Sequence, residues 1–247
     1  MMKPKNILLI DTGSTKGCVA LLVLDNLNVS LKSYSEWTEE NSHSESIIQK
    51  IQEVLLQSHL SLIDIDSIGV GNGPGSFTGI RVGLNVGRSL SYSLKKPGFV
   101  FSSLKSLALS TEFIFKTPVL TLVNAYKNQM YIAMYSWSVD KKCTSELIKP
   151  TVIDPSQLHE LDLGPCFIVG NGVEVYKSKI NPSFFSENKT CLNDLTHPEV
   201  KNFGVPLMQD QSLSKEMTWR EIKPLYIRAS EAEEKLMKGL LKSKSLR

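Results

Sequence analysis

Apolar and polar positions alternate along the first part of the chain in a pattern that predicts three strands followed by a helix. Continuous apolar runs at 7–10 and 18–24, and an alternating run at 28–37, predict the strands. Ser42-His-Ser-Glu45 matches the S-x-x-E capping box at a helix start, and an apolar repeat at helical spacing follows it. That repeat consists of Ile47, Ile48, Ile51, Val54 and Leu55.

Strands and helices then alternate. Strands are predicted at 63–70 and 99–101, and helices at 78–94 and 104–113. Three hairpin-joined strands followed by alternating helices and strands indicate an α/β fold with a mixed sheet.

The pattern restarts near residue 118 and becomes weaker. Strands are predicted at 119–123, 130–137 and 167–170, residues 177–210 show no clear pattern, and 229–241 predict a helix. This restart indicates two copies of one half-domain, the second degenerate.

We therefore expect three regions along the chain: an N-terminal lobe that carries the motifs (1–114), a divergent C-terminal lobe (115–215), and a C-terminal helix with a basic tail (216–247).

Composition adds limits on compartment and partners. The 247 residues are 41% hydrophobic and 21% charged, which is typical of a soluble globular protein, and the net charge of +3 is too small to imply nucleic-acid binding by itself. The apolar run directly before Asp11 has only four residues, 7–10, fewer than a signal peptide needs. The four cysteines form no C-x-x-C pair, which favours reduced thiols. We expect a cytoplasmic protein that does not enter a membrane.

A glycine-rich loop at 71–75 leads into the second predicted helix. Such a loop suits anion binding at a helix N-terminus, but the spacing matches neither the P-loop nor the dinucleotide fingerprint. A tight turn between strand and helix explains it equally well.

Glycines continue within that helix at every fourth residue: Gly79, Gly83 and Gly87. Glycine costs roughly 1 kcal/mol against alanine in a helix interior, so this face without side chains needs a close neighbour. A separate apolar row is available to bury the helix in its own lobe, and we therefore expect the glycine row to face a partner.

Asp11, Thr12, Gly13, Ser14 and Thr15 form a turn between two predicted strands and allow three interpretations. An Asp-Thr-Gly-Ser turn resembles the catalytic loop of aspartic peptidases, but the second loop that those enzymes need is missing. It also fits the first phosphate-contacting hairpin of actin-like and sugar-kinase-like ATPases, which would make these five residues a nucleotide site. The third interpretation is a purely structural turn.

Metal and nucleophile motifs are not found. The four histidines, His43, His59, His159 and His197, include no pair at i, i+3 or i, i+4, and no G-x-S-x-G elbow occurs. We expect no metal site and no catalytic residue.

Three motifs together resemble the TsaB (YeaZ) family of the bacterial tRNA threonylcarbamoyladenosine machinery. They are Ile10-Asp-Thr-Gly-Ser14, His43-Ser-Glu45 and Gly73-Pro-Gly-Ser-Phe-Thr-Gly-Ile-Arg-Val-Gly83. Pro224-Leu-Tyr-Ile-Arg228 is similar to the family's C-terminal motif. The resemblance covers residues 6–110 and returns at 222–235.

The resemblance implies two actin-like (ribonuclease H-like, ASKHA) lobes with mixed sheets flanked by helices. It implies a non-catalytic scaffold for a TsaD-type paralogue, which transfers threonylcarbamoyl to the tRNA adenosine next to the anticodon. A TsaE-type ATPase joins the complex, tRNA binds through the complex, and the scaffold forms a homodimer when alone. No cofactor is expected in the isolated chain, and ATP or ADP at the partner interface remains open.

The same resemblance places the partner surface on the first two helices. The predicted contact residues are His43, Glu45, Ile47, Ile51, Phe77, Gly79, Arg81, Gly83 and Gly87. One departure concerns Asn124-Ala-Tyr126, where the family commonly has Asp-Ala-Arg, so that any function of that carboxylate or that arginine is in doubt. The runner-up is an ATPase or small-molecule kinase that acts through the turn at 11–15.

Overall fold

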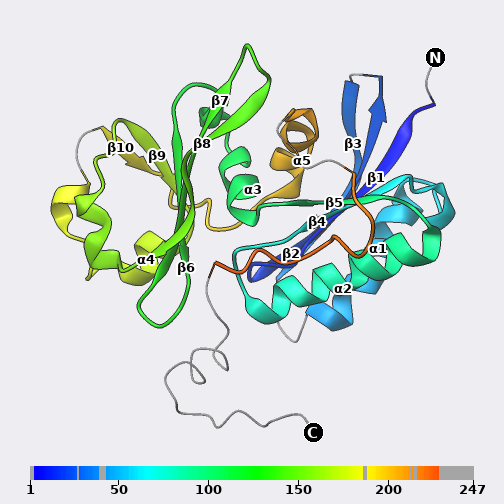
Figure 1. Ribbon diagram of the computed structural model, residues 1–247, viewed down its shortest axis with the longest axis horizontal. Coiled ribbons are helices and arrows are strands. Elements are labelled where there is room, and N and C mark those ends of the chain that lie inside the picture. Colours follow the sequence, from blue (N-terminus) through cyan, green and yellow to red (C-terminus); the bar gives the residue numbers. More distant parts are fainter. Residues whose placement is uncertain are drawn as a thin grey trace, which may run out of the picture.

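Two five-stranded mixed sheets form the framework of the chain (Figure 1). The computed structural model describes residues 3–26, 28–38, 43–185, 188–211, 213 and 216–227. The strands of the first sheet are β1 (Lys5–Asp11), β2 (Lys16–Asp25), β3 (Asn28–Thr38), β4 (Ser67–Gly71) and β5 (Gly98–Phe101). Their order is β3-β2-β1-β4-β5, with β1–β2 and β2–β3 antiparallel and the other two pairs parallel.

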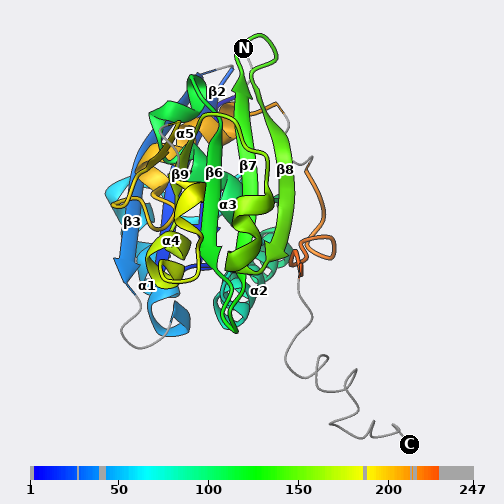
Figure 2. The same ribbon diagram turned by 90° about the vertical axis from the view of Figure 1, so that its left-hand side faces the viewer.

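The second sheet repeats this topology (Figure 2). Its strands are β6 (Val119–Asn124), β7 (Met130–Ser138), β8 (Cys143–Ile153), β9 (Cys166–Val169) and β10 (Lys189–Cys191), in the order β10-β9-β6-β7-β8. Again the first three strands in sequence pair antiparallel and the last two add in parallel. The prediction of an α/β fold with two mixed-sheet lobes is therefore confirmed.

Helices separate and cover the sheets in layers (Figure 1). α1 (His43–Gln57) and α2 (Phe77–Leu94) lie on the outer face of the first sheet, and α3 (Ser103–Leu109) and α5 (Val200–Gln209) lie between the sheets. The second lobe is degenerate: a 3₁₀ helix at Pro155–Glu160 stands where α1 would be, and α4 (Gly172–Tyr176) has five residues against the 18 of α2.

The side chains of β1 alternate between two cores, as the period of a strand requires. Ile7 and Leu9 pack toward α3 and α5 in the layer between the sheets, whereas Leu8 and Ile10 pack toward α1 and α2. Because both faces of the strand are covered, its sequence is a continuous apolar run.

α5 ties the two halves of the chain together. Although it follows the strands of the second sheet, it packs on β2, β3 and α3. Asp210 at its end accepts hydrogen bonds from the backbone N–H of Thr144 (3.1 Å) and from its hydroxyl (2.5 Å), and the Lys105 ammonium lies 3.4 Å from the carboxylate. These contacts link α3, β8 and α5 in a buried polar network.

Some predicted elements differ from the structure. The strand predicted at 63–70 begins only at Ser67, because Leu62–Asp64 forms a 3₁₀ turn closed by the Asp64 carboxylate on Ser61. The helix predicted at 104–113 ends at Leu109, and a separate 3₁₀ turn follows at Glu112–Phe115. β8 and α5 were not predicted at all. Ser42 and the helix predicted at 229–241 lie outside the described residues, and no described helix is long and apolar enough to cross a membrane.

The glycine row of α2 faces the chain's own first sheet, so the prediction that it faces a partner is wrong. All three glycines are buried. A Cβ atom at Gly79 would lie 2.1 Å from the backbone oxygen of Thr12, one at Gly83 would lie 2.6 Å from the Thr12 hydroxyl, and one at Gly87 would meet Val70 at 2.3 Å. The missing side chains let α2 lie close against β1 and β4.

We predict that Gly79→Ala destabilises the fold. The new methyl group cannot be accommodated without moving Thr12 or α2, because it would meet backbone rather than a flexible side chain. Overpacking of this kind costs about 1–3 kcal/mol in the free energy of unfolding. Urea denaturation measures it, and Asn85→Ala on the exposed face of the same helix is the control, with an expected change within about 0.5 kcal/mol. Equal stability of the two variants would contradict the close approach.

Candidate functional site

The turn between β1 and β2 meets the glycine loop where α2 begins. The backbone oxygen of Gly13 accepts a hydrogen bond from the N–H of Ser76 (2.8 Å), and the Thr12 hydroxyl donates to the oxygen of Gly79 (2.7 Å). A Cβ at Gly75 would lie 2.1 Å from the same Gly13 oxygen. The two predicted motifs are thus one packed unit, and α2 is capped within it by the Ser76 hydroxyl.

Polar groups of the turn are largely bonded within the chain. The Ser14 hydroxyl donates to the oxygen of Lys16 (2.6 Å), and a ring nitrogen of His43 lies 2.8 Å from the oxygen of Ser14. Thr12 and Gly13 are buried, whereas Thr15 is exposed. A nucleotide site at residues 11–15 stays a prediction. The hydroxyl groups of Thr12 and Ser14, which such a site would use, donate instead to backbone oxygens of the chain itself.

Asp11 is a buried carboxylic acid at the bottom of this unit. Its Oδ1 accepts the N–H of Gly13 (2.8 Å), and within the described residues neither its Oδ2 nor the neighbouring Ser103 hydroxyl forms a hydrogen bond. Burial raises the pKa of Asp11, opposed by the Gly13 N–H, by Ser103 and by the charge of His43. The protonated form is therefore favoured compared with an exposed aspartate.

Among the described residues, a small cavity marks the place where the two lobes meet. A cavity of about 80 Å³ lies between the turn, the glycine loop and the start of the second lobe, lined among others by Ser14, Ser76, Ser103 and Asn124. Sites for small molecules measure about 300–1,000 Å³. In this conformation the cleft has room for a few water molecules and not for a nucleotide.

Asn124 has a structural environment at the position where the family commonly has aspartate. Its side-chain oxygen accepts the N–H of Tyr126 (2.8 Å) and the hydroxyl of Tyr176 (2.7 Å), and its backbone N–H donates to Asn171 (2.9 Å). These bonds hold the turn after β6 to α4. The second lobe therefore offers no carboxylate at this point of the cleft.

The predicted partner residues divide into buried and exposed groups. His43, Ile47 and Ile51 are 1–3% exposed and pack inside the first lobe, so the prediction that they form the contact surface is wrong for the same reason as for the glycines. Glu45, Phe77 and Arg81 are exposed, and contact through them stays a prediction.

Two apolar residues that are not among the predicted partner residues lie on the outer surface of α1. Ile48 is 52% exposed and Leu56 is 73% exposed, eight positions apart on one side of the helix. A signal was present: Ile47-Ile48 and Leu55-Leu56 are doubled apolar pairs, and a single core-facing stripe can bury only one member of each.

At the start of α2, an exposed cluster joins the glycine-loop motif to the C-terminal motif. The Arg81 guanidinium lies 3.8 Å above the ring of Phe77 and donates a hydrogen bond to the Tyr226 hydroxyl (3.0 Å), while the two rings stack at 5.5 Å. Phe77 and Tyr226 are both exposed. Arg residues and aromatic rings of this kind dominate the binding energy of many protein interfaces.

Among the described residues, no group of three or more His, Cys, Asp or Glu side chains is placed to hold a metal ion. The arrangement is therefore a packed loop unit, a small cleft and an exposed surface over α1 and α2.

Comparisons with known proteins agree on one family. The profile described as "TsaD: tRNA N6-adenosine threonylcarbamoyltransferase" matches residues 38–236. The chain is 29% identical to "tRNA threonylcarbamoyladenosine biosynthesis protein TsaB" of Haemophilus influenzae, over 92% of this chain and 95% of that one, and 26% identical to the Escherichia coli protein of the same name, over 93% and 97%. The solved structure "YeaZ from Pseudomonas aeruginosa" superposes with a TM-score of 0.74 at 18% identity, over 90% of this chain and 99% of that chain, which shows a shared fold.

We predict that Asp11→Asn changes how stability depends on pH. The raised pKa means that the folded state holds the proton more tightly than the unfolded state does. The contribution of Asp11 to the free energy of unfolding is therefore largest below the unfolded pKa and is lost as pH rises through the folded pKa. Asparagine keeps the acceptor for Gly13 and carries no charge.

Chemical denaturation from about pH 3 to pH 7 measures the free energy of unfolding of both proteins. That of the variant should rise relative to that of the wild type as pH rises, by about 1.4 kcal/mol for each unit of difference between the folded and unfolded pKa of Asp11. The exposed Asp194→Asn is the control. Parallel curves for the wild type and Asp11→Asn would show that the carboxylate is not destabilised by burial.

Proposed function

The chain belongs to the TsaB (YeaZ) family, and on that premise we propose that it is a non-catalytic partner subunit of a TsaD-type catalyst in the formation of tRNA threonylcarbamoyladenosine. In this proposal its contribution is a docking surface that the catalyst needs, and the transfer of threonylcarbamoyl to the adenosine takes place on the catalyst.

The observation that carries this proposal is the apolar surface that α1 leaves uncovered beside α2. Ile48 and Leu56 present large apolar side chains to solvent. Half-buried Val82 and Val86 of α2 pack against the core that α1 and α2 share. Exposed apolar surface on a folded protein marks a site of interaction with another protein. Phe77 and Arg81 extend this surface toward the cleft.

The cleft supports the choice of a partner subunit over the ATPase or kinase alternative. Its volume of about 80 Å³ is too small for a nucleotide, and the turn at residues 11–15 directs Thr12 and Ser14 to bonds within the chain. An enzyme of this fold would need the lobes to open and these bonds to be exchanged.

The proposal extends to the assembly. A TsaE-type ATPase joins the pair, tRNA binds through the complex, and the chain forms a homodimer through the same surface when the catalyst is missing. The isolated chain needs no cofactor, and any ATP or ADP would bind between this chain and its catalyst. The cytoplasm, where tRNA is modified, is the expected location.

Light scattering on this protein mixed with the TsaD-type paralogue of the same organism tests the proposal. We expect a one-to-one heterodimer that replaces a homodimer. Ile48→Glu combined with Leu56→Glu should weaken this complex at least tenfold, because both carboxylates would be buried in an apolar contact. The fold should persist, since both positions face solvent.

Val139→Glu combined with Leu147→Glu is the matched control, because it places the same charges at exposed apolar positions of the second lobe. We expect this variant to bind the paralogue as the wild type does. No heterodimer with the wild type, together with ATP hydrolysis by this chain alone, would reject the proposal in favour of the enzyme alternative.

A further inference from the structure

A second cluster of aromatic and basic side chains lies at the other end of α2. The indole ring of Trp219 meets Tyr92 edge to face, with ring centroids 5.3 Å apart. The guanidinium groups of Arg88 and Arg220 lie 5.7 Å and 4.9 Å from the centre of the same ring. Together with Lys95 these residues form what we call the Trp219 cluster. The cluster combines side chains from two parts of the chain. Arg88 and Tyr92 belong to α2, whereas Trp219 and Arg220 come from the segment 216–227, which runs along α2. A β-bridge between Met217 and Gly98 of β5 holds the start of this segment.

The cluster borders an open groove of about 780 Å³. Tyr92 lines it with 64% of its surface exposed, and Lys95 lies on its rim in the left-handed conformation that ends α2. A groove of this volume accepts a nucleotide base with its sugar. The exposed tyrosine ring offers the flat surface on which a base stacks.

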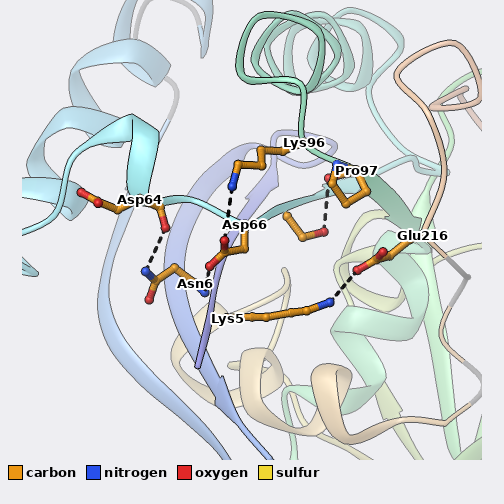
Figure 3. Close-up of polar contacts among 8 residues, drawn as sticks. Lys5, Asn6, Asp64, Asp66, Lys96, Pro97 and Glu216 are labelled. Carbon is orange, nitrogen blue, oxygen red and sulfur yellow. Dashed lines mark hydrogen bonds and ion pairs between the residues drawn. The ribbon is translucent and has the colours of Figure 1, made fainter. Parts of the chain in front are cut away.

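The charges around the groove leave an excess of free cations. Figure 3 shows that Glu216 pairs with Lys5 (3.1 Å) and that Lys96 pairs with Asp66 (3.3 Å). The Glu221 carboxylate accepts hydrogen bonds from the backbone and hydroxyl of Thr218, at 2.8 and 2.7 Å.

Within the described part of the chain, no ion pair involves Arg88, Lys95 or Arg220. In addition, α2 contains no acidic residue. The groove therefore has exposed aromatic surface with the cation of Lys95 on its rim. Two further cations, Arg88 and Arg220, lie beside it against the ring of Trp219, although the chain as a whole carries a net charge of only +3.

We propose that the Trp219 cluster is an RNA-binding site, where Arg88, Lys95 and Arg220 contact phosphates and Tyr92 stacks on an unpaired base. Single-stranded parts of RNA are recognised by this combination of stacking rings and cations. The inference rests on the proposed function, because it gives the subunit a contact of its own with the tRNA that the complex modifies. Arg88 and Tyr92 lie about a third of a turn around α2 from Val82 and Val86. They also lie at the other end of the helix from Phe77 and Arg81, so that the catalyst and the RNA can be bound together.

The test is titration of the full-length chain with a transcript of a tRNA that has adenosine next to the anticodon, at several salt concentrations. We expect Arg88→Gln combined with Arg220→Gln to weaken RNA binding at least tenfold. We also expect it to lower the slope of log affinity against log salt by about two, roughly one for each lost phosphate contact. Tyr92→Leu should weaken binding while leaving that slope unchanged, because it removes stacking and no charge.

Lys149→Gln combined with Lys177→Gln removes the same charge from exposed positions of the second lobe and serves as the control. Binding and slope equal to the wild type are expected for it. An equal loss in the control, or no loss in the Arg88 and Arg220 variant, would overturn the RNA site.

Light scattering of each variant with the TsaD-type paralogue separates the two proposals. Retained heterodimer with weakened RNA binding supports the site. Loss of the heterodimer in the Arg88 and Arg220 variant, with RNA binding unchanged, would assign the cluster to the protein partner and overturn this inference. If the wild type forms no heterodimer, the proposed function is rejected. The RNA titration still decides whether the Trp219 cluster binds RNA, because it uses this chain alone.

Discussion

The close approach of two backbone segments determines much of what this chain presents to its surroundings. The first turn of α2 lies on the turn between β1 and β2, with the oxygens of Thr12 and Gly13 against Gly79 and Gly75 at distances that no Cβ atom could share. Two hydrogen bonds cross this contact, from Ser76 to Gly13 and from Thr12 to Gly79, and they fix how the two segments are oriented toward each other. Because the atoms in contact belong to the main chain, a larger residue at Gly75 or Gly79 cannot be accommodated by rotation of side chains, and α2 itself would have to move.

This contact has consequences on both sides. Toward the cleft, it brings the turn at residues 11–15 against the glycine loop and leaves a cavity of about 80 Å³. On the helix side, the contact fixes how α2 is turned, so that its three faces have different neighbours. The glycine face is used by the sheet, Val82 and Val86 lie on the side of α1, and Arg88 and Tyr92 lie on the side of the segment 216–227. In the proposed function, the chain acts through its outer helices and not through the cleft.

The strands were predicted best where the local pattern of apolar residues is sufficient to identify them. β1 and β2 are buried on both faces and read as uninterrupted apolar runs, and α2 was predicted to within one residue at its start. α5 was missed, because Gly204 and Pro206 weaken its helical pattern and its partners β2 and β3 lie far away in the sequence.

The proposed contact surface could be predicted only in part, for a related reason. A glycine row shows that something comes close, but its neighbour Thr12 is 67 positions from Gly79, and spacing alone cannot distinguish that neighbour from another subunit. The stripe of Ile47 and Ile51 had the same ambiguity, and burial in the first lobe resolves it. The doubled apolar pairs on α1 carried the more specific signal, since residues left over from a filled core must face outward.

Hydrogen–deuterium exchange of this chain, alone and with the TsaD-type paralogue, tests most directly the claim that it works through α1 and α2. The account predicts that added paralogue slows exchange in peptides from 43–57 and 77–94, while ATP alone leaves peptides from 11–15 and 123–128 unchanged. Slower exchange at 11–15 with ATP alone, and no change at α1 and α2 with the paralogue, would contradict it.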